Sequence, residues 1–106
     1  MKVLLLSAIA ALLVGCTGPQ MVSGSEQVRI SKINPDENKY EFVSEVSCDF
    51  GMNFVTVSTN LRNCRNDLKN KAAQVSASLV VVESESIGNS GCSNCVSMFG
   101  SAYTKR

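Results

Sequence analysis

The stretch from residue 59 to residue 83 constrains the fold most, because a helical pattern gives way to a strand pattern within a few residues. Between Thr59 and Ala77 the apolar side chains recur every three or four positions, as on one face of a helix. They are Leu61, Cys64, Leu68, Ala72 and Val75. Ser58 or Thr59 is suited to cap this helix. The next run, residues 79–83 (LVVVE), is typical of a strand buried on both faces, so the helix is expected to pack on a sheet.

Further strands are expected on both sides of this unit. Residues 27–33 and 40–48 alternate apolar with polar side chains, and the Asn- and Pro-containing turn between them allows a hairpin. A last strand is expected over residues 96–104. The order β-β-α-β-β predicts a small α+β domain, with one helix packed on a mixed sheet of about four strands and stapled by disulfides. The second and third strands then run parallel, joined by a right-handed crossover.

Three segments between these elements are less regular. Residues 87–93 are rich in Gly, Asn and Ser and are expected to form a loop. Gly100, inside the last strand, marks a bulge or a close approach of another backbone. Residues 49–57 (DFGMNFVTV) form either a loop or a short extra strand, and the apolar side chains of residues 50–57 either enter the core or form a contact surface. A contiguous exposed patch there would favour binding.

The amino terminus has the character of a secretory signal. Lys2 gives a positive start, and residues 3–14 are apolar apart from Ser7. The apolar run is too short to span a bilayer. We therefore divide the chain into a signal peptide (1–15), a flexible tether (16–26) and a folded domain (27–106).

Leu13-Val14-Gly15-Cys16 resembles the signal of bacterial lipoproteins. The resemblance implies a lipid thioether on Cys16, cleavage after Gly15 and acylation of the new amino terminus by fatty acids such as palmitate. Thr17 stands where an Asp would oppose sorting to the outer membrane, so we expect the periplasmic face of the outer membrane. Two or more acyl chains give stable attachment without a transmembrane helix, at ~0.8 kcal/mol per buried methylene. The alternative is an ordinary signal peptide or core helix with an incidental Cys.

The other four cysteines of the five in the chain are Cys48, Cys64, Cys92 and Cys95. An even number in a small exported domain predicts two disulfides. The expected topology gathers all four at one end of the domain, as bridging requires. We hypothesise the pairs Cys48–Cys92 and Cys64–Cys95, the first of which would stabilise the domain by ~4 kcal/mol. For Cys92-Ser93-Asn94-Cys95, a redox pair and part of a four-thiolate zinc site are the less favoured interpretations.

Composition narrows the function further. There is no His, the most common general base and metal ligand. Removal of the expected signal peptide takes away Lys2, and the remaining nine basic side chains balance nine acidic ones. No basic surface for nucleic acid is therefore expected. We expect no enzymatic activity, no metal and no cofactor.

A second resemblance covers most of residues 28–103. It is carried by Asn66-Asp67-Leu68-Lys69-Asn70-Lys71-Ala72-Ala73, Ala77, Leu79-Val80-Val81-Val82, Gly100-Ser101-Ala102-Tyr103 and Glu45-Val46-Ser47-Cys48. These segments resemble a family of uncharacterised bacterial lipoproteins and the signalling domain of the RcsF family, outer-membrane lipoproteins that report envelope stress. The resemblance implies two disulfides in a non-consecutive pattern, to which Cys48, Cys92 and Cys95 can be matched. Cys64 departs from it, because the family places that cysteine on the strand after the helix. Ser76 stands where the uncharacterised family usually has Gly.

Three functions follow as hypotheses. The first is a non-enzymatic, lipid-anchored protein that binds an envelope protein partner, as in RcsF-like stress signalling. The second is a thiol-disulfide oxidoreductase that uses Cys92 and Cys95. The third is a structural envelope lipoprotein without a fixed partner.

Overall fold

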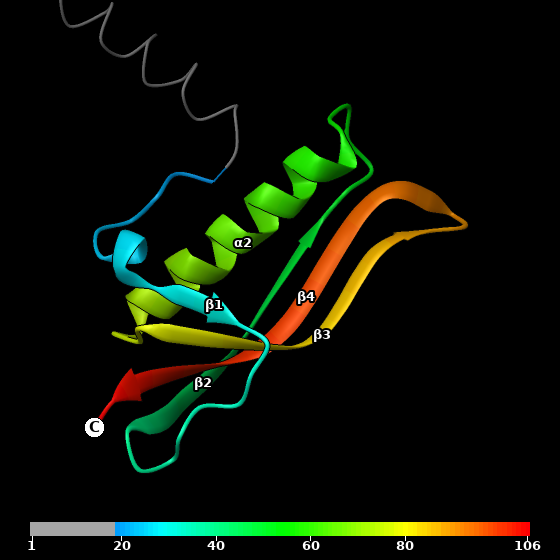
Figure 1. Cartoon of the computed structure of the whole chain (residues 1–106). Helices are drawn as coiled ribbons and strands as arrows, with labels where there is room; N and C mark the ends of the chain where they lie inside the picture. Colours follow the sequence, from blue (N-terminus) through cyan, green and yellow to red (C-terminus); the bar gives the residue numbers. More distant parts are fainter. Residues whose placement is uncertain (1–18) are drawn as a thin grey trace, which may run out of the picture.

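A computed structural model describes residues 19–106, and Figure 1 shows one helix lying across one face of a twisted sheet. The elements are the 3-10 turn η1 (Ser25–Gln27), β1 (Arg29–Ser31), β2 (Tyr40–Phe50), helix α2 (Val57–Gln74), β3 (Leu79–Asn89) and β4 (Cys92–Lys105). The predicted α+β fold is confirmed, with a mixed sheet of four strands and two disulfides.

The sheet has the strand order β1-β3-β4-β2. β1 pairs in parallel with β3, and β4 runs antiparallel to both of its neighbours, β3 and β2. The hairpin expected between residues 27–33 and 40–48 is therefore wrong, because β1 and β2 occupy opposite edges. β2 and β3 do run in the same direction, as predicted, but β4 lies between them. β1 instead flanks the apolar start of β3, where Ile30 lies opposite Val80.

The helix begins and ends earlier than the expected range of residues 59–77. Its N-cap is Thr56, whose Oγ1 accepts a hydrogen bond from the amide of Thr59 at 3.2 Å. At the other end, the amide of Ala77 donates to the carbonyl of Ala72, and the amide of Ser76 donates to the carbonyl of Ala73. This pair of bonds is a Schellman motif, which places the residue after the cap in the left-handed region. That residue is Ser76, with φ of 60°.

We expect Ser76→Gly to stabilise the domain. A side chain in the left-handed region costs roughly 1–2 kcal/mol, which glycine avoids, while the added freedom of the unfolded glycine offsets part of that gain. A net gain of ~1 kcal/mol corresponds to a rise in Tm of about 4–8 °C for a domain of this size. Thermal unfolding followed by circular dichroism measures it, with Ser78→Gly as the control. A fall in Tm for Ser76→Gly would contradict the assignment of this cap.

The core lies between α2 and the inner face of the sheet. The helix supplies three fully buried apolar side chains, those of Cys64, Leu68 and Ala72. The strands supply Val46, Cys48, Val80, Val82, Val96, Met98 and Ala102. Strands β3 and β4 approach closely at Gly100, because a Cβ atom there would collide with the carbonyl oxygen of Val81. The close approach expected at this glycine is thus confirmed, next to an irregularity in β3 between Val82 and Ser84.

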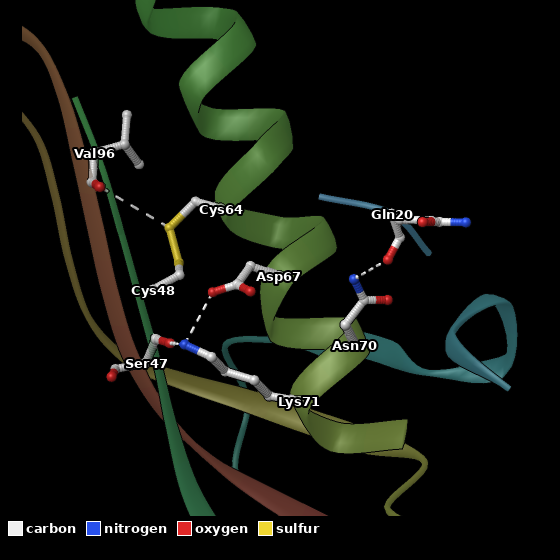
Figure 2. Close-up of polar contacts among 8 residues, drawn as sticks. All are labelled: Gln20, Ser47, Cys48, Cys64, Asp67, Asn70, Lys71 and Val96. Carbon is white, nitrogen blue, oxygen red and sulfur yellow. Dashed lines mark hydrogen bonds and ion pairs between the residues drawn. A yellow bond between two sulfur atoms is a disulfide. The ribbon is translucent and has the colours of Figure 1, made fainter. Parts of the chain in front are cut away.

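Two backbone carbonyl groups of the edge strand β2 accept hydrogen bonds from side chains. Lys71 of α2 donates to the carbonyl of Ser47 and pairs with Asp67 at 2.9 Å, as Figure 2 shows. The hydroxyl of Ser44 donates to the carbonyl of Glu45 at 2.9 Å. Such contacts reduce the tendency of an edge strand to pair with another chain.

The segment before β1 is attached to the helix. Figure 2 shows the side-chain amide of Asn70 donating to the carbonyl of Gln20, at 2.9 Å. The side-chain oxygen of Asn70 accepts from the amide of Val22 at 3.0 Å, and Ser25 is 1% exposed. We expected residues 16–26 to be a flexible tether. The part of this segment that the structure describes is bound to α2 instead, because the nearly buried side-chain amide of Asn70 finds its hydrogen-bond partners in that segment. Cys16 lies outside the described residues.

Within residues 19–106, no helix combines the length and the apolar character needed to cross a membrane.

Candidate functional site

The disulfides join different pairs from those hypothesised. Cys48 of β2 is bonded to Cys64 of α2, and Cys92 is bonded to Cys95. The pairs Cys48–Cys92 and Cys64–Cys95 are therefore wrong. Cys48 lies on the inner face of β2, opposite the apolar stripe of α2 that carries Cys64, which brings their Cα atoms to 5.3 Å (Figure 2).

The four cysteines nevertheless gather at one end of the domain, as the topology predicted. The Sγ atom of Cys64 lies 4.0 Å from the carbonyl oxygen of Val96, the residue that follows Cys95 (Figure 2). Gly51, three residues after Cys48, packs against Cys95 so closely that a Cβ atom on Gly51 would lie 2.8 Å from the Cα atom of Cys95. We call this end the disulfide pole.

Cys92 and Cys95 bracket a bulge at the tip of the β3–β4 hairpin. The loop expected over residues 87–93 is reduced to a turn at Ser90 and Gly91, because β3 runs to Asn89 and β4 begins at Cys92, which pairs with it. The ladder resumes with Ile87 opposite Val96, so Gly88 of β3 faces three residues of β4. The Cα atoms of Cys92 and Cys95 are 5.5 Å apart, whereas three steps of an extended strand span roughly 10 Å. The bulge and the disulfide thus occur at the same place, and Ser93 and Asn94 lie between the two bonded cysteines.

Three asparagines join the bulge to the loop between β2 and α2. The side-chain amide of Asn94 donates to the carbonyl oxygens of Asn53 and Val55, at 2.9 Å and 3.0 Å, and also lies 3.0 Å from Oδ1 of Asn53. Asn53 and Asn60 exchange two side-chain hydrogen bonds, at 2.9 Å and 3.1 Å. Asn60 also donates to the carbonyl of Asn94 at 2.7 Å. We call Asn53, Asn60 and Asn94 the asparagine cluster.

The cluster was not identified from the sequence, although one signal for it was present. Asn60 precedes Cys64 by four residues and Leu68 by eight, so it continues the apolar stripe of the helix. It is fully buried, and a buried amide requires hydrogen-bond partners. The identity of those partners depends on the bulge in β4, which no local pattern indicated.

The loop that this cluster holds carries exposed apolar side chains. Relative to a fully accessible reference residue, Met52 is 82% exposed and Phe54 is 109% exposed. Val55 and Val57 are about two-fifths exposed. We call residues 52–57, of which Val57 is the first residue of α2, the apolar loop. The apolar side chains of residues 52–57 therefore lie outside the core, whereas Phe50 is half-buried against it.

The disulfide pole thus carries the Cys92–Cys95 disulfide, the asparagine cluster and the exposed apolar loop. A surface depression of about 510 Å³ lies elsewhere, between β1 and α2. Among residues 19–106, no group of three or more His, Cys, Asp or Glu side chains is arranged to hold a metal ion. Comparison with models of protein families, with curated proteins and with solved structures finds no match for this chain.

Proposed function

We propose that the protein is a lipid-anchored lipoprotein of the outer membrane, facing the periplasm, which binds an envelope protein through its apolar loop and has no enzymatic activity. The lipid anchor rests on Leu13-Val14-Gly15-Cys16, and the disulfides are consistent with an oxidising compartment. RcsF-like stress signalling is the finer form of this proposal, and it rests on sequence resemblance.

The observation that carries the proposal is the exposure of the apolar loop together with its attachment. Single exposed apolar residues are ordinary, but Met52, Phe54, Val55 and Val57 fall within six residues. Hydrogen bonds from Asn94 hold two of the backbone carbonyls of this loop. A surface ordered in advance loses less conformational freedom on binding, so more of its contact energy appears as affinity.

The attachment of residues 20–22 to α2 limits the reach of the domain. If Cys16 carries the lipid, at most the four residues 16–19 separate the lipid from the bound segment, a span of ~14 Å. The domain is then held close to the inner surface of the outer membrane. The partner we propose is an envelope protein that presents an apolar pocket to Phe54.

The test is site-specific photo-crosslinking in the envelope of a diderm bacterium that produces the full chain. A photoreactive residue in place of Phe54 is expected to give one discrete protein adduct. The same residue in place of Ile33, which is 80% exposed and lies outside the disulfide pole, is the matched control and is expected to give none. Cys16→Ser is expected to abolish the adduct, because the unlipidated chain is no longer held at the membrane.

Adducts of equal yield at both positions would contradict docking through the apolar loop. Adducts with lipid alone would assign the loop to the bilayer and would equally contradict a protein partner. Retention of the Cys16→Ser chain in the membrane fraction would contradict the lipid anchor.

One observation favours the oxidoreductase as a second candidate. Cys92 and Cys95 are bonded to each other, are both only half-buried and enclose two residues, as in dithiol oxidoreductases. Catalysis of insulin reduction by dithiothreitol, lost in Cys92→Ser, would support this candidate over the binding protein.

A further inference from the structure

We propose that the Cys92–Cys95 disulfide is a redox latch for the apolar loop: when it is closed the loop is held for docking, and when it is reduced the loop is released. The inference rests on the docking role proposed above, since it concerns how the same surface is regulated. Its structural basis is the position of Asn94, which lies between the two bonded cysteines and contacts the apolar loop.

The first step of the argument is the geometry that the disulfide imposes. The bond keeps the Cα atoms of Cys92 and Cys95 5.5 Å apart, and the intervening residues are thereby displaced from the ladder with β3. In this displaced position the side chain of Asn94 donates to the carbonyls of Asn53 and Val55. Once the bond opens, the segment can extend toward the spacing of a regular strand, which moves Asn94 away from the loop.

Two further contacts couple the same cysteines to the loop. The Sγ atom of Cys92 lies 3.2 Å from Oδ1 of Asn94, and a disulfide sulfur carries no hydrogen to donate to it. Reduction therefore changes the contact that Asn94 makes with this sulfur atom. Gly51, immediately before the apolar loop, packs against the backbone of Cys95 with no room for a side chain. Movement of Cys95 therefore removes the support at the start of the loop.

The two disulfides differ in accessibility. Cys64 is 0% exposed and Cys48 is 4% exposed, so a reductant reaches their bond only if the core opens. Cys92 and Cys95 are half-buried at a hairpin tip, next to exposed Ser93. Because thiol–disulfide exchange requires direct attack on a sulfur atom, an ordinary dithiol reduces the second bond and spares the first.

The chemical step is reduction by a protein dithiol of the envelope. One thiolate of the reductant attacks a sulfur of the Cys92–Cys95 bond and forms a mixed disulfide, releasing the other cysteine as a thiolate that takes up a proton. The second thiol of the reductant then displaces the remaining cysteine. Two electrons and two protons pass to Cys92 and Cys95, and the reductant is left as a disulfide.

The experiment uses the mature lipidated chain in detergent micelles, with backbone ¹⁵N order parameters measured before and after treatment with dithiothreitol. Alkylation followed by peptide mapping is expected to label Cys92 and Cys95 before Cys48 and Cys64. In the reduced protein, order parameters of residues 52–56 are expected to fall from about 0.8 to below ~0.6, while those of residues 64–72 in α2 stay unchanged.

Two sets of variants separate the latch from general loss of structure. Asn94→Ala, with the disulfide intact, is expected to release the loop as reduction does, whereas Ser93→Ala is the matched control and leaves it ordered. The double substitution of Cys92 and Cys95 by serine reproduces the reduced state without a reductant. An ordered loop in the reduced protein would overturn the proposal, and so would labelling of Cys48 and Cys64 first.

The latch and the docking role fail in distinguishable ways. The order parameters are measured without a partner, so they test the latch independently of the docking role. Photo-crosslinking at position 54 of the oxidised protein decides the docking role alone. If both hold, reduction lowers the yield of the crosslinked adduct at least several-fold, and an unchanged yield would show that the release of the loop does not regulate docking.

Discussion

Replacing Cys48 and Cys64 together by alanine is expected to lower the free energy of unfolding by about 3 kcal/mol or more. The bond joins residues 16 apart in the sequence, and closing a loop of that length stabilises by ~3 kcal/mol on the chain-entropy relation. Loss of the two sulfur atoms also leaves a cavity between β2 and α2, because both cysteines are buried. Chemical denaturation under non-reducing conditions, extrapolated to water, measures the change.

The matched control is the double alanine substitution of Cys92 and Cys95. Its loop spans a separation of only 3 residues, for which the same relation gives ~2 kcal/mol, and its sulfur atoms are not part of the core. The Cys48–Cys64 bond is thus the structural cross-link of this small domain, and the Cys92–Cys95 bond is a local one. A greater loss of stability in the control than in the Cys48 and Cys64 variant would contradict this distinction.

Leu68→Ala is expected to cost about 2–5 kcal/mol, the range for truncating a fully buried leucine. Leu68 is 0% exposed and lies one turn after Cys64 on the face of α2 that packs on the sheet. Domains of this kind have total stabilities of roughly 5–15 kcal/mol, so the loss removes a large share of it. Urea denaturation followed by circular dichroism gives the value directly.

Val75→Ala is the control for this prediction. The helical period assigns Val75 to the same stripe as Leu68, but α2 ends at Gln74 and Val75 is 41% exposed. The expected cost is within about 0.5 kcal/mol, as for an ordinary surface substitution. Equal costs at the two positions would mean that the helix continues to pack beyond its observed end.

The sequence by itself determined the types of the elements and the faces that they bury. The stripe through Cys64 and Leu68, the β-branched run from Leu79 and the glycine at position 100 each depend on interactions within a few residues or on a period set by backbone geometry. Even the Cys48–Cys64 bond could have been predicted, because both residues fall on core-facing positions of neighbouring elements. Such features could be predicted because local chemistry dictates them.

Only the tertiary structure decided the strand neighbours, the second disulfide and the exposure of the apolar loop. β1 joins β3 rather than β2 because the apolar start of β3 needs a neighbour on its open side, and that partner is remote in the chain. Cys92 and Cys95 are bonded where three residues of β4 oppose one residue of β3, a mismatch between two strands that neither strand encodes alone. The apolar loop stays outside the core because Asn94 of β4 and Asn60 of α2 both hydrogen-bond to its Asn53.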